Sequence, residues 1–391
     1  MIYLELLFGF CIFLLFYTYI GYGILLATIV LVKKVFKAEE TKNKKFLEPL
    51  VTLLIAAYNE GSILEAKINN SRNLDYPKDN LKLLFITDGS DDNSAEVLKK
   101  YPDVQYLHQE RREGKASALN RGMTYVKTPI VVFSDANSMV NPEAIREMVK
   151  HFENPKIGGV AGEKRIKKNS VDAASGSGEG FYWHYESILK RLDGEFYSVV
   201  GAAGELFSIR RDLYEPLEED TLLDDFILSL RIAMNGHRIA YEPGAYSIES
   251  ASISIKEELK RKIRICAGGF QAITRLKNLL NPFKFGRLSF QFISHRVLRW
   301  TLAPLSLLVV LPLNLILHFE TQNIFYTYSL FGQILFYLLA FAGWLLENYK
   351  LRLKTFFIPY YFLMMNLSVY LGFFRYILNR QSVIWDRAER G

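Results

Sequence analysis

Cysteine is nearly absent from this chain, whose 391 residues include only Cys11 and Cys266. Two cysteines cannot build a disulfide framework or a cysteine-rich zinc site, so both classes of small stabilised domain are excluded. This cysteine usage fits a reducing compartment for the soluble part of the protein. Half of the residues are hydrophobic, yet the mean hydropathy is only +0.07. That combination indicates apolar segments joined to an ordinary soluble domain.

A glycine-rich phosphate loop, internal repeats and long linkers are also missing. Gly114 and Lys115 resemble the end of a Walker loop, but the upstream glycines that such a loop needs are absent. The net charge is +7, and the basic residues gather beside apolar runs. This favours membrane-flanking charges over a nucleic-acid surface. The residues concerned are Lys33, Lys34, Lys37, Lys284, Arg287, Arg296 and Arg299.

Long apolar runs are present at both ends of the chain, each near the length that crosses a bilayer. They cover residues 6–32, 298–318, 324–346 and 356–374. The first is too long for a signal-peptide core, so we predict an uncleaved anchor over residues 1–34. The other three predict a C-terminal membrane region over residues 281–378, followed by a tail at 379–391.

The lysines after the first run predict that the middle domain is cytoplasmic and that the protein is a multi-pass protein of the cell membrane. Four crossings put the tail outside the cell. Its basic residues Arg380, Arg387 and Arg390 disagree there with the charge rule, by which basic residues flank membrane segments on the cytoplasmic side.

Strand and helix patterns alternate over residues 47–150, which predicts an α/β fold with a parallel sheet and right-handed crossovers. We expect strands at 50–56, 81–86, 104–107, 129–133 and 206–209, and helices at 61–72, 92–100 and 114–126. A long amphipathic helix over 255–280 completes a predicted cytoplasmic domain at 47–280. The small-residue stretch 173–178 predicts a loop over the site.

Polar motifs follow three of these strands directly. They are Tyr58-Asn59-Glu60, Asp88-Gly89-Ser90 and Asp135-Ala136-Asn137. Each alone is typical of a turn or a helix cap. Together, at the carboxyl ends of neighbouring parallel strands, they favour a nucleotide crevice. Asp135 and Asn137 could also hold a hard divalent cation against phosphate oxygens.

The second half of the chain offers further candidates, each with an ordinary structural explanation. Asp224 and Asp225 open a helix, where acids are stabilised by the helix dipole, but one of them could also take a proton from an acceptor hydroxyl. Arg261 and Arg264 lie opposite an apolar helical stripe, facing either solvent and headgroups or a diphosphate.

Trp183 belongs to an aromatic cluster that is more often core than a sugar platform. Gly204 and Glu205 end a small-residue run that allows a ligand to approach the backbone closely.

These residues, in this order, resemble the family 2 glycosyltransferases of the GT-A fold. The resemblance is to the membrane-integrated branch that includes cellulose, chitin, hyaluronan and poly-N-acetylglucosamine synthases, and it runs from about residue 47 to 270. The matching motifs are Ala57-Tyr58-Asn59-Glu60, Asp88-Gly89-Ser90, Gly114-Lys115-Ala116-Ser117-Ala118-Leu119, Asp135-Ala136-Asn137, Leu223-Asp224-Asp225 and Arg261-Lys262-Ile263-Arg264-Ile265. The last departs most from the family pattern, because Arg261 replaces a Gln and Ile265 replaces the Trp that processive members stack near the acceptor.

The resemblance implies a Rossmann-like nucleotide-diphospho-sugar domain flanked by transmembrane helices, and a metal-dependent, inverting transfer of a sugar from a nucleotide-sugar donor to a glycan acceptor. It implies catalytic roles for Asp225 and Asp224, and Mg²⁺ or Mn²⁺ at Asp135 and Asn137. The implied nucleotide-sugar-binding residues are Ala57, Tyr58, Glu60, Asp88, Lys115, Asp135 and Arg264. The acceptor would meet Trp183, Gly204 and Glu205.

Three alternatives stay open from the sequence. The enzyme could add one sugar to a lipid-linked acceptor without processivity, or the chain could be a silent scaffold or export subunit. A transporter without enzymatic activity is disfavoured, because the apolar runs contain almost no ionisable residues. The expected partners are the donor, the glycan or lipid-linked acceptor, membrane lipid and accessory or export subunits, with no nucleic acid.

Overall fold

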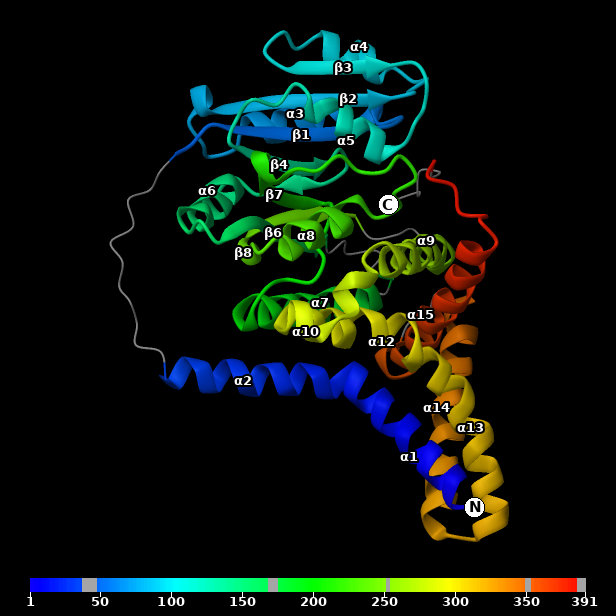
Figure 1. Ribbon diagram of the computed structural model, residues 1–391. Coiled ribbons are helices and arrows are strands. Elements are labelled where there is room, and N and C mark those ends of the chain that lie inside the picture. Colours follow the sequence, from blue (N-terminus) through cyan, green and yellow to red (C-terminus); the bar gives the residue numbers. More distant parts are fainter. Residues whose placement is uncertain (37–47, 168–174, 251–253, 349–352, 385–391) are drawn as a thin grey trace.

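One sheet organises the middle of the chain (Figure 1). The computed structural model describes residues 1–36, 48–167, 175–250, 254–348 and 353–384. Its strands are β1 Val51–Ala57, β2 Leu81–Asp88, β3 Gln105–Gln109, β4 Ile130–Asp135, β5 Met139–Val140, β6 Ile157–Ile166, β7 Leu206–Arg210 and β8 Arg238–Glu249. They form an eight-stranded sheet in the order β3-β2-β1-β4-β7-β6-β8-β5. The predicted α/β class is confirmed.

The half of the sheet from β1 to β4 is parallel, as predicted. β1 pairs with β2 and β4, and β2 pairs with β3. Each of β1 and β4 is a nearly continuous run of buried apolar residues, as strands covered on both faces require. Asp88 ends β2 and Asp135 ends β4, so the parallel pairing brings both carboxylates to one edge of the sheet.

The other half is mixed, and the expectation of a parallel sheet is wrong there. β7 is antiparallel to β4 and to β6, β8 is parallel to β6, and β5 is antiparallel to β8. The sequence did not reveal β6, because its glycines interrupt the hydrophobic pattern. A Cβ built on Gly159 would lie 2.9 Å from the carbonyl oxygen of Ser208, so the close approach of β6 and β7 requires glycine.

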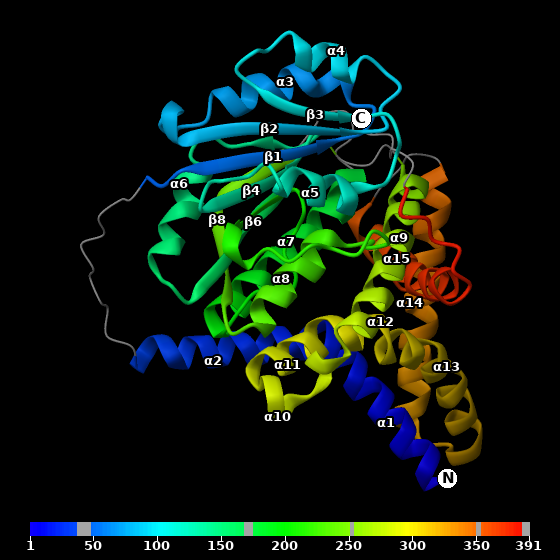
Figure 2. The same cartoon turned by 45° about the horizontal axis from the view of Figure 1, so that its top comes forward.

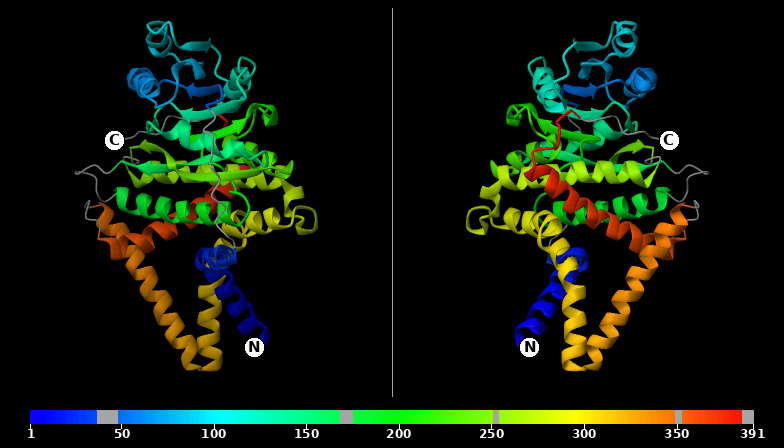
Figure 3. Two further views of the ribbon diagram at one scale, coloured as in Figure 1. Left: turned by 90° about the vertical axis from the view of Figure 1, so that its left-hand side faces the viewer. Right: turned by 90° about the vertical axis from the view of Figure 1, so that its right-hand side faces the viewer.

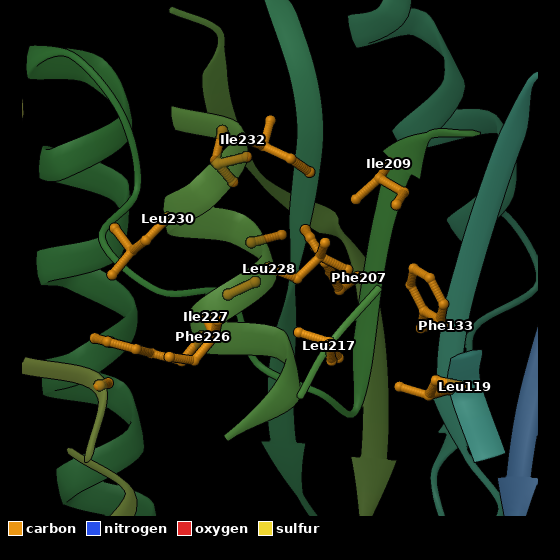
Figure 4. Close-up of a cluster of buried hydrophobic side chains, with 14 of the residues drawn as sticks. Leu119, Phe133, Phe207, Ile209, Leu217, Phe226, Ile227, Leu228, Leu230 and Ile232 are labelled. Atoms are coloured by element: carbon orange, nitrogen blue, oxygen red, sulfur yellow. The ribbon is translucent and has the colours of Figure 1, made fainter. Parts of the chain in front are cut away.

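Helices cover both faces of the sheet. On one face lie α3 Gly61–Arg72, α4 Ser94–Lys99 and α6 Ala144–Val149, and on the other α5 Lys115–Met123, α8 Asp224–Met234 and α9 Ile255–Arg275. Figure 2 shows α3 and α4 on one side of β1 and β2 and α5 on the other. On the face that carries α5, α8 and α9, the hydrophobic core joins the sheet to α8 through Phe133, Phe207 and Ile227 (Figure 4). The rings of Phe133 and Phe207 stack with their centroids 6.0 Å apart. This packing fixes the start of α8 relative to the end of β4.

The other elements of the described domain are one long helix and several short helical turns. They are α7 Ser175–Phe196, α10 Pro282–Phe285, α11 Arg287–Phe292 and α12 Leu298–Trp300, with the π-helical turn η6 Ile293–Val297 and the 3₁₀ turns η2 Lys78–Asn80, η3 Lys150–Glu153, η4 Arg211–Leu213 and η5 Lys277–Leu280. The predicted loop at 173–178 is wrong for residues 175–178, which begin α7, while 173 and 174 lie outside the described residues. The predicted helix 255–280 ends at Arg275.

Four helical stretches are long and apolar enough to cross a membrane. They are α1 Ile2–Phe16 with η1 Tyr17–Gly21 and α2 Tyr22–Phe36, then α13 Leu302–Thr321, α14 Ile324–Asn348 and α15 Lys354–Ile377. The first stretch is bent rather than straight. Figure 1 shows α1 beside α13 below the domain, while α2 runs along the base of the domain. The π-helical turn η1 lies at the bend, where a wider turn disturbs the regular ladder.

The last long helix lies against the domain. α15 packs on α9, where a Cβ on Gly372 would lie 2.6 Å from Cys266 Cβ. Figure 3 shows α13 and α14 projecting away from the sheet, while α15 lies near the level of α7 and α9. After α15 the chain returns to the sheet edge, since a Cβ built on Gly114 would lie 3.2 Å from Val383 Cγ1. The predicted tail therefore meets the domain, although residues 385–391 lie outside the described part.

Candidate active site

A single cavity of about 620 Å³ collects all of the predicted site residues. It is lined by Ala57, Tyr58, Glu60, Asp88, Lys115, Asp135, Asn137, Trp183, Gly204, Glu205, Asp224, Asp225 and Arg264. These come from the ends of parallel strands, the starts of α5 and α8, and the faces of α7 and α9. The residues converge as the sequence motifs predicted, while their individual roles stay predictions.

Asp88 fixes the loop that leads into α5. Its Oδ2 accepts hydrogen bonds from the backbone N–H groups of Gly114 at 2.7 Å and Glu113 at 3.1 Å. Gly114 has a φ of 97°, which favours glycine. The other oxygen, Oδ1, is buried and makes no hydrogen bond within the described residues. Asp88 therefore holds the loop with one oxygen, while the other lies 3.7 Å from Arg121 Nη2.

Tyr58 is covered by an arginine that sequence reasoning missed. The Arg112 guanidinium lies 3.4 Å from the centroid of the Tyr58 ring, and both side chains line the cavity. Gly89 makes this possible, because a Cβ there would lie 2.7 Å from the backbone nitrogen of Arg112. The Arg111-Arg112 pair beside the Gly114-Lys115 motif could have indicated this contact with Tyr58, but a charged pair in a loop is usually solvated.

Lys115 is the electrostatic centre of the site. Its Nζ lies 2.7 Å from Asp135 Oδ1 and 3.5 Å from Asp224 Oδ2. Burial disfavours the charged ammonium, but Asp135, Asp224 and Asp225 outweigh burial and raise the pKa of Lys115. The lysine therefore stays charged and ties the end of β4 to the start of α8.

Asp135 and Asn137 have the chemistry of a divalent-cation site. Asn137 Oδ1 is buried and has no hydrogen-bond partner within the described residues, so it is free to act as a ligand. No cluster of three or more His, Cys, Asp or Glu side chains that could hold a metal occurs in the described ranges. Two protein oxygens fit Mg²⁺ or Mn²⁺ when phosphate oxygens supply the other ligands.

Asp225 is a carboxylate of raised pKa at the start of α8. It lies in the first turn of α8, and Gly204 faces it, since a Cβ on Gly204 would lie 3.6 Å from Asp225 Oδ2. Burial, followed by the charge of Asp224, raises the pKa of Asp225 to about 7, against the opposing effect of Lys115. A carboxylate with a pKa near 7 accepts a proton far better than an ordinary aspartate.

The predicted acceptor residues lie among buried charges. Glu205 is 2.5 Å from Lys164 Nζ, and Lys164 also lies 2.5 Å from Glu249. Burial opposes ionisation of Glu205, but the Lys164 charge dominates and lowers its pKa. The Trp183 ring has Lys164 at 4.9 Å and Lys262 at 5.2 Å from its centroid. The aromatic cluster is therefore part of a polar cavity wall rather than simply core.

The basic side of α9 faces the cavity. The apolar stripe of α9 packs on α15, as Ile263 and Cys266 are buried there. Arg264 and Arg261 line the cavity, so the alternative of a solvated or headgroup-facing surface is wrong. Burial lowers the pKa of Arg264, with Asp224 opposing this effect. Arg261 pairs with Glu258, at 2.7 Å.

The far end of the cavity was not foreseen. We interpreted Arg296 and Arg299 as membrane-flanking charges, but Arg296 is buried and Arg299 is half-buried. Both line the cavity and pair with Glu186, at 2.6 and 3.0 Å. Lys190 of α7 joins them. Residues of the apolar helices complete this end, and they are Tyr19, Ile20, Ile358, Tyr361, Phe362, Met365, Asn366 and Val369. A local pattern cannot show that segments so distant in sequence share one wall.

Comparisons with known proteins agree with this geometry. A poly-beta-1,6-N-acetyl-D-glucosamine synthase of Staphylococcus epidermidis is 27% identical over 235 residues, and that of Staphylococcus aureus is 28% identical over 235 residues. Each alignment covers 58% of this chain and 56% of the relative, so it spans little more than half the length of these relatives.

The fold is shared with a solved protein. A mannosyltransferase from Pyrobaculum calidifontis, in complex with GDP-Man and Mn²⁺, superposes with a TM-score of 0.70 at 19% identity, covering 96% of this chain and 99% of that one. The likeness confirms the predicted GT-A architecture. Residues 52–217 match the family model described as glycosyl transferase family 2. Residues 52–217 therefore match family 2 glycosyltransferases, and they lie in a domain of GT-A fold.

Proposed function

We propose that this enzyme transfers a sugar from a nucleotide-sugar donor to a glycan acceptor at the membrane, with inversion and with a divalent metal. One observation carries the proposal: the same cavity joins Asp88 and Asp135 at the sheet edge to Asp225 and then to the apolar helices. The donor, the base and a membrane-derived acceptor can thus meet in one enclosed space. By resemblance to the staphylococcal synthases, the transferred unit is a hexose or N-acetylhexosamine. The donor that we propose is UDP-linked.

The chemistry is a single displacement. Asp225 takes the proton of an acceptor hydroxyl, whose oxygen forms a bond to the anomeric carbon as the bond to the diphosphate oxygen breaks. Asp88 and Tyr58 bind the nucleoside, and Arg264 meets the charge that grows on the departing diphosphate. A metal held by Asp135 and Asn137 would neutralise phosphate charge.

The experiment that tests this function is a donor screen. Purified protein in lipid discs is given a panel of UDP- and GDP-sugars, and released nucleotide is measured with and without Mn²⁺. Metal-stimulated release of UDP from one sugar supports the proposal, and release from no donor contradicts it. Product length then shows whether the enzyme is processive, since Ile265 lines the cavity where processive members have Trp.

Arg264→Ala should lower turnover by about 10²-fold, more than it weakens donor binding, because its interaction strengthens as the diphosphate leaves. Steady-state kinetics with the active donor measure both quantities. Arg261→Ala is the matched control on the same face of α9, because its guanidinium is already paired with Glu258. Equal, small losses in both variants would contradict the role of Arg264.

The membrane topology follows from the position of the tail. We propose that α1, α13 and α14 cross the membrane, that α2 and α15 lie at its cytoplasmic surface, and that the domain is cytoplasmic. The proximity of Val383 to Gly114 supports this, because a crossing by α15 would separate the tail from the domain. Three crossings also put Arg380 on the cytoplasmic side, which removes the disagreement with the charge rule.

Cysteine labelling tests this topology in a background without Cys11 and Cys266. We expect a membrane-impermeant maleimide to label Asn323→Cys, in the turn between α13 and α14, in intact cells. Ser382→Cys, in the tail, should react only after lysis, and both positions are exposed. Labelling of Ser382→Cys in intact cells would restore the four-crossing topology.

A further inference from the structure

A buried lysine without a counter-ion lies at the membrane side of the cavity. Lys190, on α7, is 6% exposed and lines the cavity, and within the described residues its ammonium has no hydrogen bond or ion pair. Burial lowers the pKa of Lys190, although Glu186 partly opposes this. The Trp183 ring centroid lies 6.0 Å from this ammonium, but within the described residues no carboxylate pairs with it. A buried ammonium without a counter-ion is costly, so the site favours the arrival of an anion.

The wall around Lys190 carries an excess of positive charge. Arg296 and Arg299 share a single carboxylate, Glu186, so this wall has three cations against one anion. The other acids near Lys190 are Glu205, which Lys164 engages, and Asp225, whose pKa is raised by burial to about 7. The charge is therefore not neutralised by the protein itself.

The cavity beyond this wall is apolar and reaches the lipid-facing helices. Ile20 at the bend of the first helical stretch is 54% exposed, and Ile358 of α15 is 45% exposed. Both line the cavity together with Phe362 and Met365. The end of the cavity thus combines an anion-attracting wall with a hydrocarbon-compatible opening, which suits a molecule with an anionic head and a long apolar chain.

We propose that Lys190, together with Arg296 and Arg299, binds the phosphate or diphosphate of a lipid-linked acceptor whose hydrocarbon chain leaves between Ile20 and α15. This rests on the proposed function and names its acceptor class. In this arrangement the donor diphosphate binds to a different wall of the cavity, which is formed by Asp135, Asn137 and Arg264. The lipid phosphate is not consumed, because only the acceptor hydroxyl reacts.

Lys190→Met tests the proposal with two acceptors that carry the same sugar. One is a synthetic polyprenyl-diphosphate-linked N-acetylglucosamine, and the other is the neutral octyl β-N-acetylglucosaminide. With the enzyme in phosphatidylcholine discs, we expect the KM for the diphosphate acceptor to rise about 10- to 100-fold, as loss of a charged hydrogen bond predicts. The KM for the neutral acceptor and for the donor should stay unchanged.

Two control variants separate charge from packing. Lys190→Arg should retain most of the affinity for the diphosphate acceptor. Arg191→Met removes the next charge along the same helix, an exposed one paired with Glu195, and should change nothing. An equal loss with both acceptors would assign Lys190 to packing, and a raised donor KM would assign it to the donor diphosphate. Either result overturns the proposal.

A binding measurement keeps the result independent of transfer. Fluorescent polyprenyl diphosphate, without a sugar, should bind the parent enzyme and bind Lys190→Met about 10- to 100-fold more weakly. This holds even if the donor screen finds no substrate, so failure of the proposed function and failure of the acceptor site are distinguishable. If phosphatidylglycerol in the disc displaces the probe as effectively as unlabelled polyprenyl diphosphate, the site binds bilayer headgroups and the acceptor assignment is wrong.

Discussion

Asp225→Asn should lower sugar transfer by about 10²- to 10⁴-fold while nucleotide binding persists, because an amide cannot accept the proton of the acceptor hydroxyl. The side chain keeps its size, so the contact between Gly204 and the start of α8 is preserved. Transfer is measured with the active donor, and UDP affinity by calorimetry. The exposed Asp212→Asn, in η4, is the control for a change of charge alone. Transfer within a few-fold of the parent would rule out Asp225 as the base.

The pH dependence of the parent enzyme gives a second view of the same residue. Burial and Asp224 raise the pKa of Asp225 to about 7, so the group becomes protonated, and inactive as a base, as the pH falls through 7. We expect kcat/KM to fall about tenfold per pH unit below that value. A plateau that continues down to pH 5 would contradict the raised pKa or the role.

Asp135→Ala should abolish the metal-dependent part of nucleoside-diphosphate binding. Even residues that only support a metal ligand typically contribute about 10- to 100-fold to metal affinity, so loss of a ligand should cost at least that much. Asn137→Asp should be tolerated, because a carboxylate there is also an oxygen ligand and adds negative charge. Calorimetry of UDP with and without Mn²⁺ is the measurement.

The geometry around Asp135 sharpens this test. Lys115 keeps a carboxylate partner in Asp224 when Asp135 is removed, so the start of α5 should stay in place. The exposed Asp79→Ala, in η2, controls for loss of an acid elsewhere in the domain. If Asp135→Ala binds UDP with unchanged Mn²⁺ dependence, Asp135 is not a metal ligand and its role is only to pair with Lys115.

Local patterns were sufficient for the parallel half of the domain. The run Val51–Ala57 is apolar except for Thr52, and Tyr58 follows it, so both the strand and the motif at its end could be predicted. The same reasoning failed for β6, where Gly158, Gly159 and Gly162 erase the hydrophobic pattern. Glycine is needed at these positions because residues that are close in space, such as Ser208 and Leu206, leave no room for a side chain. Neighbours in sequence do not show this.

The sequence shows where the basic residues lie along the chain, but not which groups they contact in the folded protein. Arg296 and Arg299 follow the pattern of membrane-flanking residues, yet both pair with Glu186, more than a hundred residues earlier in the chain. Lys190 lies in an amphipathic helix where a lysine is usually solvated. Only the packing of α7 against η6 and α12 makes it a buried cation in a cavity.

The sequence by itself determined the glycosyltransferase motifs, the parallel strands that carry them and the presence of apolar helices, because each depends on residues close together in the chain. The tertiary structure decided the antiparallel half of the sheet, the bend at η1, the return of the tail to Gly114 and the cavity that joins the polar edge of the sheet to the apolar helices. These features depend on contacts between distant segments, whose energies come from burial and charge pairing that a local pattern does not contain.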